Sequence, residues 1–135
     1  MIDYFHQADD PYSHLIAQLL RPLARLYGLD VRPWLVPPPD DAAAPERARL
    51  AAYARRDAPR LAAEYGLTFP EDAAPPSPEA TAQAQRVLAA ALKAPDFFER
   101  AVAVGEALWS GDLAGGTAAQ ASVDETDAAL LEGDA

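Results

Sequence analysis

The chain has 135 residues, 21 of them acidic and 11 basic, so its formal net charge is −10. This acidity argues against sequence-independent nucleic-acid binding, because such binding needs Lys and Arg to displace counterions from phosphates. The absence of cysteine excludes disulfides, thiolate metal sites and thiol–disulfide exchange by this chain. No apolar run approaches the roughly 18 residues of a membrane-spanning helix, and residues 1–10 are not typical of a signal peptide. We therefore expect a soluble, cytoplasmic protein.

The first 36 residues predict a strand, a helix and a second strand. Residues 2–6 are β-prone, and Asp10 followed by Pro11 is typical of a helix start. Leucines at helical spacing continue to Tyr27, and Gly28 ends the helix. Residues 31–36 form the second strand, and a strand–helix–strand unit with short joints predicts parallel pairing. Because Pro33 has no N–H for a ladder, we place the second strand at a sheet edge.

Residues 40–110 are predicted to be helical, with helices at about 45–65, 78–94 and 97–109. A proline-rich loop, residues 69–78, separates the first two. The predicted buried stripe of the first helix is Leu50, Tyr53, Ala54, Leu61 and Tyr65. The largest aromatic groups are expected in the core: Trp34, Phe97, Phe98 and Trp109.

Residues 111–135 have a different composition, with much Ala and Gly, six acidic side chains and no basic one. We expect this segment to be disordered, apart from a short helix at 125–132. The chain thus divides into a βαβ half (1–39), a helical region (40–110) and an acidic tail. Two parallel strands do not make a stable sheet by themselves, so either a partner supplies strands or the sheet is incomplete.

The strongest local candidate for chemistry is the run Asp10-Pro11-Tyr12-Ser13-His14 at the first helix N-terminus. Free N–H groups and the helix dipole stabilise an anion there. An acidic N-cap followed by Pro and Ser also begins many ordinary helices, and that alternative is the more common one.

Two further clusters are weaker. A metal site built from His6, Asp9, Asp10 and His14 matches no ligand spacing, so we expect a strand-end histidine and a solvated helix-start histidine instead. Five arginines lie between residues 47 and 60, where either an anionic ligand or neighbouring acidic side chains would pair with them. We expect no metal.

Several motifs in order resemble the DsbA-like thioredoxin superfamily. Residues 2–5 followed by Asp10-Pro11-Tyr12-Ser13 resemble the strand and the four-residue motif that open the fold in kappa-class glutathione transferases and 2-hydroxychromene-2-carboxylate isomerases. Residues 53–62 with Gly66-Leu67-Thr68-Phe69-Pro70, and then Ala107-Leu108-Trp109, resemble later motifs of that branch. The resemblance covers about residues 2–112.

This resemblance implies an α/β, thioredoxin-like βαβ unit with an inserted helical domain, in which the family's closing strand–strand–helix is missing. It implies glutathione as cofactor and a small electrophile as substrate, with Pro11, Tyr12 and Ser13 binding glutathione and Asp10 and Ser13 catalytic. The departures are substantial: Asp10 stands where the branch has Ser or Cys, and an ionised carboxylate repels a thiolate. The chain also lacks the Asn that often helps to bind glutathione in this family.

Three alternatives therefore stay open. The first is a glutathione-dependent isomerase or transferase that is degenerate or truncated. The second is a non-catalytic interaction module, which binds a partner through its sheet edge or its acidic tail. A homodimer is one such association. The third is a fragment without activity, because exposed strand edges and few bulky apolar residues disfavour stable folding.

Overall fold

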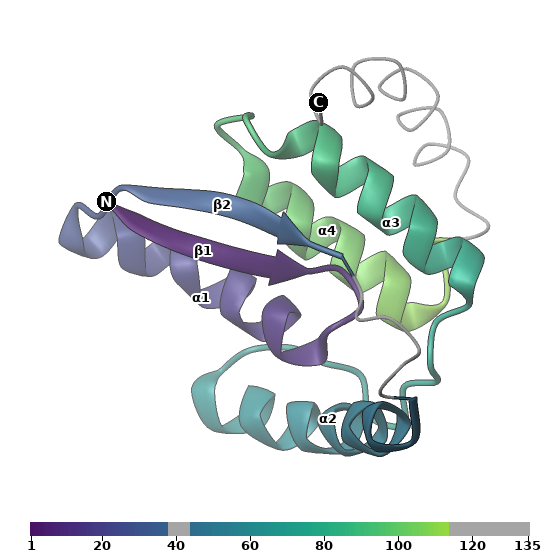
Figure 1. Cartoon of the computed structure of the whole chain (residues 1–135). Coiled ribbons are helices and arrows are strands. Elements are labelled where there is room, and N and C mark those ends of the chain that lie inside the picture. The colour runs from purple at the N-terminus through teal and green to yellow at the C-terminus, as the bar shows by residue number, and fades with distance from the viewer. Residues whose placement is uncertain (38–43, 114–135) are drawn as a thin grey trace.

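The computed structural model describes residues 1–37 and 44–113. These residues form two strands and four helices, in the order β1 (Ile2–Gln7), α1 (Pro11–Tyr27), β2 (Val31–Val36), α2 (Ala44–Tyr65), α3 (Pro78–Ala91) and α4 (Phe97–Ser110) (Figure 1). The predicted strands and helices are confirmed to within a few residues at their ends. The acidic tail from residue 114 onward, including the short helix expected at 125–132, lies outside the described residues.

The strand–helix–strand unit forms as the sequence predicts, and β1 pairs with β2 in parallel from Ile2 opposite Val31 to Gln7 opposite Val36. Asp10 caps α1 with an extended backbone and a side chain that accepts from the Tyr12 N–H. At the other end Gly28 has φ 63°, a left-handed conformation that favours glycine, and its N–H donates to the Ala24 carbonyl. These local signals set both ends of α1, which continues through Pro22.

The sheet has one covered and one open face. Tyr4 and His6 are buried against α4, with ring centroids 5.8 Å from Phe98 and 6.0 Å from Phe97 respectively. In the view of Figure 1 the two strands lie in front of α1 and α4. The alternate side chains point the other way, so Phe5 is 61% exposed and no described helix covers it.

Trp34 was expected in the core, and this prediction is wrong. It lies opposite Phe5 in the sheet register and is 43% exposed on the same open face. The two rings stack at 6.3 Å, and the indole Nε1 donates to Asp3 Oδ1 at 3.0 Å. The alternation of β2 turns Leu35 toward the core and leaves the larger aromatic group outside.

The core is built largely from alanine. Its large buried members are Leu15, Phe69, Leu88, Phe97, Leu108, Trp109 and Leu113, and the others are alanines: Ala8, Ala17, Ala58, Ala62, Ala80, Ala84, Ala91 and Ala101. Small side chains bring helices close together, which lets four short helices share one core. The expected stripe of α2 is corrected in part, because three of its four large members are exposed, Leu50, Tyr53 and Tyr65, and only Leu61 packs against the core. Ala54 is buried as expected, and Ala58 and Ala62 complete the buried stripe, since small groups fit against the neighbouring elements.

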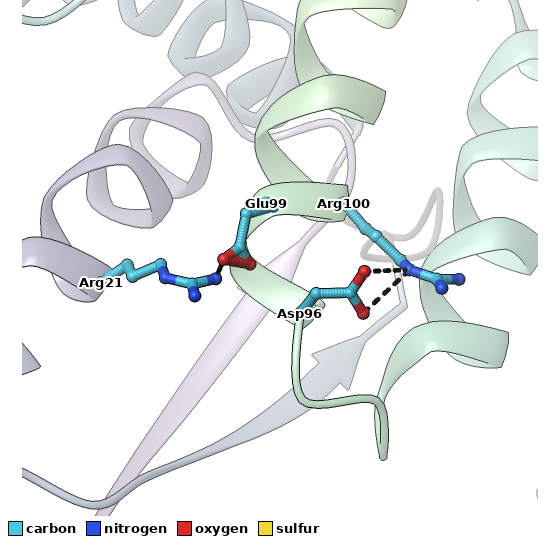
Figure 2. Close-up of polar contacts among 4 residues, drawn as sticks. All are labelled: Arg21, Asp96, Glu99 and Arg100. Atoms are coloured by element: carbon cyan, nitrogen blue, oxygen red, sulfur yellow. Dashed lines mark hydrogen bonds and ion pairs between the residues drawn. The ribbon is translucent and has the colours of Figure 1, made fainter.

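One ion pair joins α1 to α4 at the surface, and a second lies within α4. Arg21 of α1 points toward Glu99 of α4 and forms an ion pair with it, while Arg100 pairs with Asp96 within the first turn of α4 (Figure 2). Exposed pairs of this kind contribute less than about 1 kcal/mol each. The packing of α1 on α4 therefore depends mainly on the apolar contacts beneath them.

The described residues thus form a mixed α/β fold with a two-stranded parallel sheet, which confirms the α/β class. The thioredoxin-like topology, and the absence of a closing strand–strand–helix, stay predictions. The core cluster includes residues from both the expected βαβ half and the expected helical region, such as Leu15 and Leu88.

Candidate functional site

The candidate site begins at the joint between β1 and α1. The Asp10 carboxylate lies across the first turn of α1, where Oδ1 accepts from the Tyr12 N–H and Oδ2 accepts from the Ser13 hydroxyl, both at 3.1 Å. The helix N-terminus therefore already holds an anion, supplied by the chain itself. Each carboxylate oxygen has a second lone pair, so Asp10 retains the capacity to accept from a ligand.

Ser13 is buried, with 5% of its surface exposed. Its hydroxyl donates to Asp10 and accepts from the Gln7 N–H at 3.2 Å. One hydroxyl thus joins the last residue of β1 to the first turn of α1. Because its proton is directed at Asp10, this arrangement favours Asp10 over Ser13 as the group that would accept a proton from a substrate.

The two remaining predicted binding residues have different environments. Pro11 is buried, and Tyr12 is half-buried with its hydroxyl donating to Asp57 Oδ2 of α2 at 2.9 Å. Burial, followed by the hydrogen bond to Asp57, raises the pKa of Tyr12 to about 12. Tyr12 therefore stays a neutral hydrogen-bond donor and ties α1 to α2.

A buried pair that the sequence did not indicate lies directly behind this turn. The Tyr4 hydroxyl donates to the Ser13 carbonyl at 3.1 Å and lies 2.6 Å from His6 Nδ1. Since the hydroxyl has one proton, Nδ1 of His6 must be the protonated nitrogen that donates to it. Burial raises the pKa of Tyr4, while burial and the nearby His14 lower the pKa of His6 to about 4. Both groups are neutral near pH 7.

His14 was expected to be solvated, and this prediction is wrong because only 3% of its surface is exposed. Its ring fits against Gly105 of α4 so closely that a Cβ at that position would lie 2.2 Å from Nδ1. Nδ1 is buried and has no hydrogen-bond partner among the described residues. Burial lowers the pKa of His14 to about 4, so the ring is neutral near pH 7.

The ring of His14 also lines a concavity of about 630 Å³ beside the start of α1. The loop after α2 forms its rim through Leu67, Thr68 and Phe69, and α4 contributes Glu106. The Phe69 ring lies 6.0 Å from the imidazole of His14 and 5.2 Å from Trp109. This volume accommodates a small organic molecule, and its aromatic and aliphatic lining suits an apolar body.

Sequence reasoning thus placed Asp10 to Ser13 correctly on one helix turn but missed the contact of Tyr4 with His6 and that of Tyr12 with Asp57. Burial of alternate residues in β1 is a signal that could have indicated Tyr4 and His6, whereas the contact with Asp57 spans 45 residues and leaves no local signal. Within residues 1–37 and 44–113, no group of three or more His, Cys, Asp or Glu side chains is arranged to hold a metal ion.

None of the helices in those two segments combines the length and the apolar character needed to cross a bilayer. Comparisons with family models, with curated proteins and with solved structures found no match to this chain.

Proposed function

We propose that this chain is a thioredoxin-like protein of the branch that uses glutathione, acting as an isomerase or transferase on a small electrophile. The observation that carries the proposal is the first turn of α1, where Asp10, Pro11, Tyr12 and Ser13 follow the parallel strand β1 after a two-residue turn. The order of the described elements, β1, α1, β2 and then α2 to α4, supports the same branch.

In this proposal the glutathione thiol lies at the N-terminal turn of α1 and Asp10 acts as its base. The S–H bond breaks, the proton passes to a carboxylate oxygen, and the resulting thiolate faces a neutral acid instead of a like charge. The positive end of the α1 helix dipole then stabilises the sulfur. Ser13 positions Asp10 through its 3.1 Å hydrogen bond, and Tyr12 remains neutral beside the sulfur.

The concavity lined by His14 and Phe69 supports a small electrophile as the second substrate. It lies beside the same helix turn and includes the carboxylates of Glu71 and Glu106 in its lining. Carboxylates disfavour an anionic ligand, so the electrophile is neutral, with an apolar body that packs on Phe69. The neutral His14 ring provides a polar edge in an otherwise apolar wall.

The first test is a thermal melt of the 135-residue chain with and without millimolar glutathione. Binding to the folded state alone raises the melting midpoint, so we expect a rise with glutathione and a smaller rise with S-methylglutathione, which has no thiol. The Tyr12→Phe variant should respond less than the wild type. Tyr27→Phe is the matched control, since it removes the same hydroxyl from an exposed position at the opposite end of α1. A midpoint that glutathione leaves unchanged refutes the proposal.

A specific observation favours a second candidate, a non-catalytic module that associates with a second copy of itself. The open sheet face presents Phe5 and Trp34 as a stacked pair beside Asp3 and Arg32, which form an ion pair at 3.0 Å. A face that contains both a carboxylate and a guanidinium is self-complementary about a two-fold axis, since each charge meets its opposite. Parallel sheets are normally covered on both faces, and a second copy would cover this one.

Sedimentation equilibrium from micromolar to millimolar protein tests this candidate. We expect a concentration-dependent dimer in the wild type and a monomer for Phe5→Ser, which removes the exposed ring and leaves the buried face of β1 intact. Tyr65→Ser is a suitable control because that ring is similarly exposed, at 60%, but lies at the end of α2. A wild-type chain that stays monomeric throughout overturns the candidate.

A further inference from the structure

We propose that the groove between α2 and the loop that follows it binds an amino acid with two carboxylates and one ammonium group. The groove has a volume of about 560 Å³, which accommodates a small organic molecule. One wall carries Arg55, Arg56 and Arg60 of α2, and the other carries Glu71 and Asp72 of the loop. The first turn of α1 does not line this groove, so the inference is independent of the function proposed above.

The wall on α2 is one side of that helix. Its lining residues follow the i, i+3, i+4 spacing of a single helix side from Ala52 to Ala63. Within residues 1–37 and 44–113 none of its three arginines forms an ion pair or a side-chain hydrogen bond. A guanidinium is a planar fork of N–H donors that matches the two oxygens of a carboxylate. This wall therefore offers carboxylate-binding groups that no described acidic side chain occupies.

The opposite wall is held by contacts that precede it directly in the chain. The Thr68 N–H donates to Gln18 Oε1 at 2.9 Å, and the Gln18 amide donates back to the Thr68 carbonyl at 2.8 Å. Phe69 is buried in the core. Asp72 has φ 55°, a left-handed conformation that aspartate tolerates better than most residues other than glycine. These anchors place Glu71 and Asp72 at the groove before a ligand arrives, which lowers the entropic cost of binding.

Opposite charges thus line one groove without pairing. Neither Glu71 nor Asp72 forms an ion pair with an arginine of α2, or with any other residue that the structure describes. A molecule with anionic groups on one side and a cationic group on the other pairs with both walls at once.

The number of charges selects the class of ligand. Three guanidinium groups and two carboxylates give the lining a formal charge of +1. The complementary ligand has a net charge of −1, as a dicarboxylic α-amino acid has. A diacid without an ammonium group would leave Glu71 and Asp72 unpaired and be repelled by them. The small apolar side chains between the charges suit its methylene groups: Ala52, Pro59 and Ala63.

An NMR titration of the ¹⁵N-labelled 135-residue chain tests the proposal with three probes of similar size: L-glutamate, glutarate and L-glutamine. Glutarate lacks the ammonium group, and glutamine lacks the second carboxylate. We expect saturable shifts of the amides of Arg56, Arg60 and Asp72 with glutamate, and weaker binding of both analogues. The dissociation constant should be on the order of millimolar, because each pair of exposed charges contributes little.

Shifts that map away from the groove, or no saturation well above millimolar glutamate, overturn the proposal. Equal affinity for either analogue also overturns it, because one wall would then contribute nothing. None of the probes has a thiol, so a failure here leaves the proposed function at the start of α1 untouched.

Two variants test the walls separately. Arg60→Gln should weaken glutamate binding about two- to fivefold, the range for one exposed ion pair. Arg25→Gln makes the same change of net charge at an exposed position of α1 and should leave the affinity unchanged. Equal weakening by both variants, or none by Arg60→Gln, refutes the assignment of the α2 wall.

The loop wall predicts effects of opposite sign on two ligands. Asp72→Asn should weaken glutamate binding, since the ammonium group loses a partner, and strengthen glutarate binding, since a repulsive charge is removed. Asparagine tolerates the same left-handed backbone, so the loop keeps its conformation. Asp30→Asn removes an equal charge from an exposed position outside the groove and is the control. If Asp72→Asn changes both affinities in the same direction, or acts no differently from Asp30→Asn, the loop carboxylates do not bind the ammonium group and the proposal fails.

Discussion

At the scale of single residues, the joint between β1 and α1 depends on side chains that each make two contacts. The Ser13 hydroxyl both donates and accepts, and the Tyr4 hydroxyl bonds to His6 and to the backbone of Ser13. Buried networks of this kind are stable when every member has a partner and costly when one is removed. The joint is therefore sensitive to changes that alter little volume.

The Ser13→Ala variant tests that sensitivity. It removes two hydrogen bonds and leaves the partly buried Gln7 N–H without its acceptor, so we expect a loss of about 1–2 kcal/mol in the free energy of unfolding. Urea unfolding followed by circular dichroism measures it. Ser110→Ala is the control, because that exposed hydroxyl bonds only at the end of α4 and its loss should cost less than about 0.5 kcal/mol. Equal losses in the two variants would show that the hydrogen bonds of the Ser13 hydroxyl do not stabilise the joint between β1 and α1.

The two buried histidines predict a stability that depends on pH. His6 and His14 have pKa values lowered to about 4 in the folded chain, mainly by burial, against 6.5 for the ordinary group. The unfolded chain therefore binds protons more readily, and the folded state loses stability as the pH falls from 6.5 to 4. Above pH 6.5 both rings are neutral in the folded and in the unfolded chain, so protonation of the histidines no longer lowers the free energy of unfolding.

Urea unfolding at intervals between pH 7 and pH 4 measures this dependence, which should be on the order of 3 kcal/mol for each histidine. In the His14→Gln variant the change in the free energy of unfolding between pH 7 and pH 4 should be about half that of the wild type, whatever the stability of the variant at pH 7. A wild-type stability that stays flat between pH 6.5 and 4.5 would show that the rings are accessible to protons in the folded chain.

At the scale of elements, α1 and α4 pack closely because Gly105 has no side chain. A Cβ at Gly105 would lie 2.2 Å from Nδ1 and 2.6 Å from Cε1 of His14, so the ring would have to move. We expect Gly105→Ala to destabilise the chain by about 1–3 kcal/mol, although alanine is the better helix former. Thermal and urea unfolding both report the change.

A double variant separates this clash from a general effect on α4. When His14 is replaced by Ala, the space beside Gly105 is free, and adding Gly105→Ala should then stabilise the helix by up to about 1 kcal/mol. The sign of the second substitution should therefore reverse between the two backgrounds. If Gly105→Ala destabilises both equally, the packing against His14 is not its cause.

The contrast between element boundaries and element faces shows what the sequence could predict. Asp10, Pro11 and Gly28 are local signals, so the ends of α1 followed from the residues at those ends. Which face becomes buried depends on distant partners. The burial of His14 needs Gly105 across the core, and the exposure of Trp34 depends on which face of β2 the helices cover.

The candidate site shows the same division. The run from Asp10 to Ser13 could be found in the sequence because one helix turn holds it together. Its supporting contacts could not be found there, since Tyr12 reaches Asp57 on α2 and the concavity beside His14 is lined by the distant loop at Phe69. Chemistry placed on one turn is visible in the sequence, whereas its environment is a property of the packed chain.

At the scale of the whole molecule, one core connects the sheet to all four helices. Phe97 is 2% exposed, and its ring lies 6.0 Å from His6 of β1 and 5.4 Å from Phe98. The same cluster includes Ala58 of α2 and Leu88 of α3, so residues of the predicted βαβ half and of the predicted helical region are buried together. Two independently stable parts would each need a hydrophobic core. An alanine-rich chain of this size has too few bulky side chains to fill two cores.

We therefore expect the strands and the helices to unfold in one transition, and Phe97→Leu to shift that transition as a whole. Loss of the ring should cost about 1–3 kcal/mol, because a leucine leaves part of the space between β1 and α4 unfilled. Far-ultraviolet circular dichroism reports the helices and near-ultraviolet circular dichroism reports the packed aromatic rings, so coincident midpoints identify a single transition. Leu50→Ala is the control, since that side chain is 67% exposed on α2 and should shift neither signal appreciably. If Phe97→Leu moves the near-ultraviolet midpoint and leaves the helical signal in place, the sheet and the helical region are separate cooperative units.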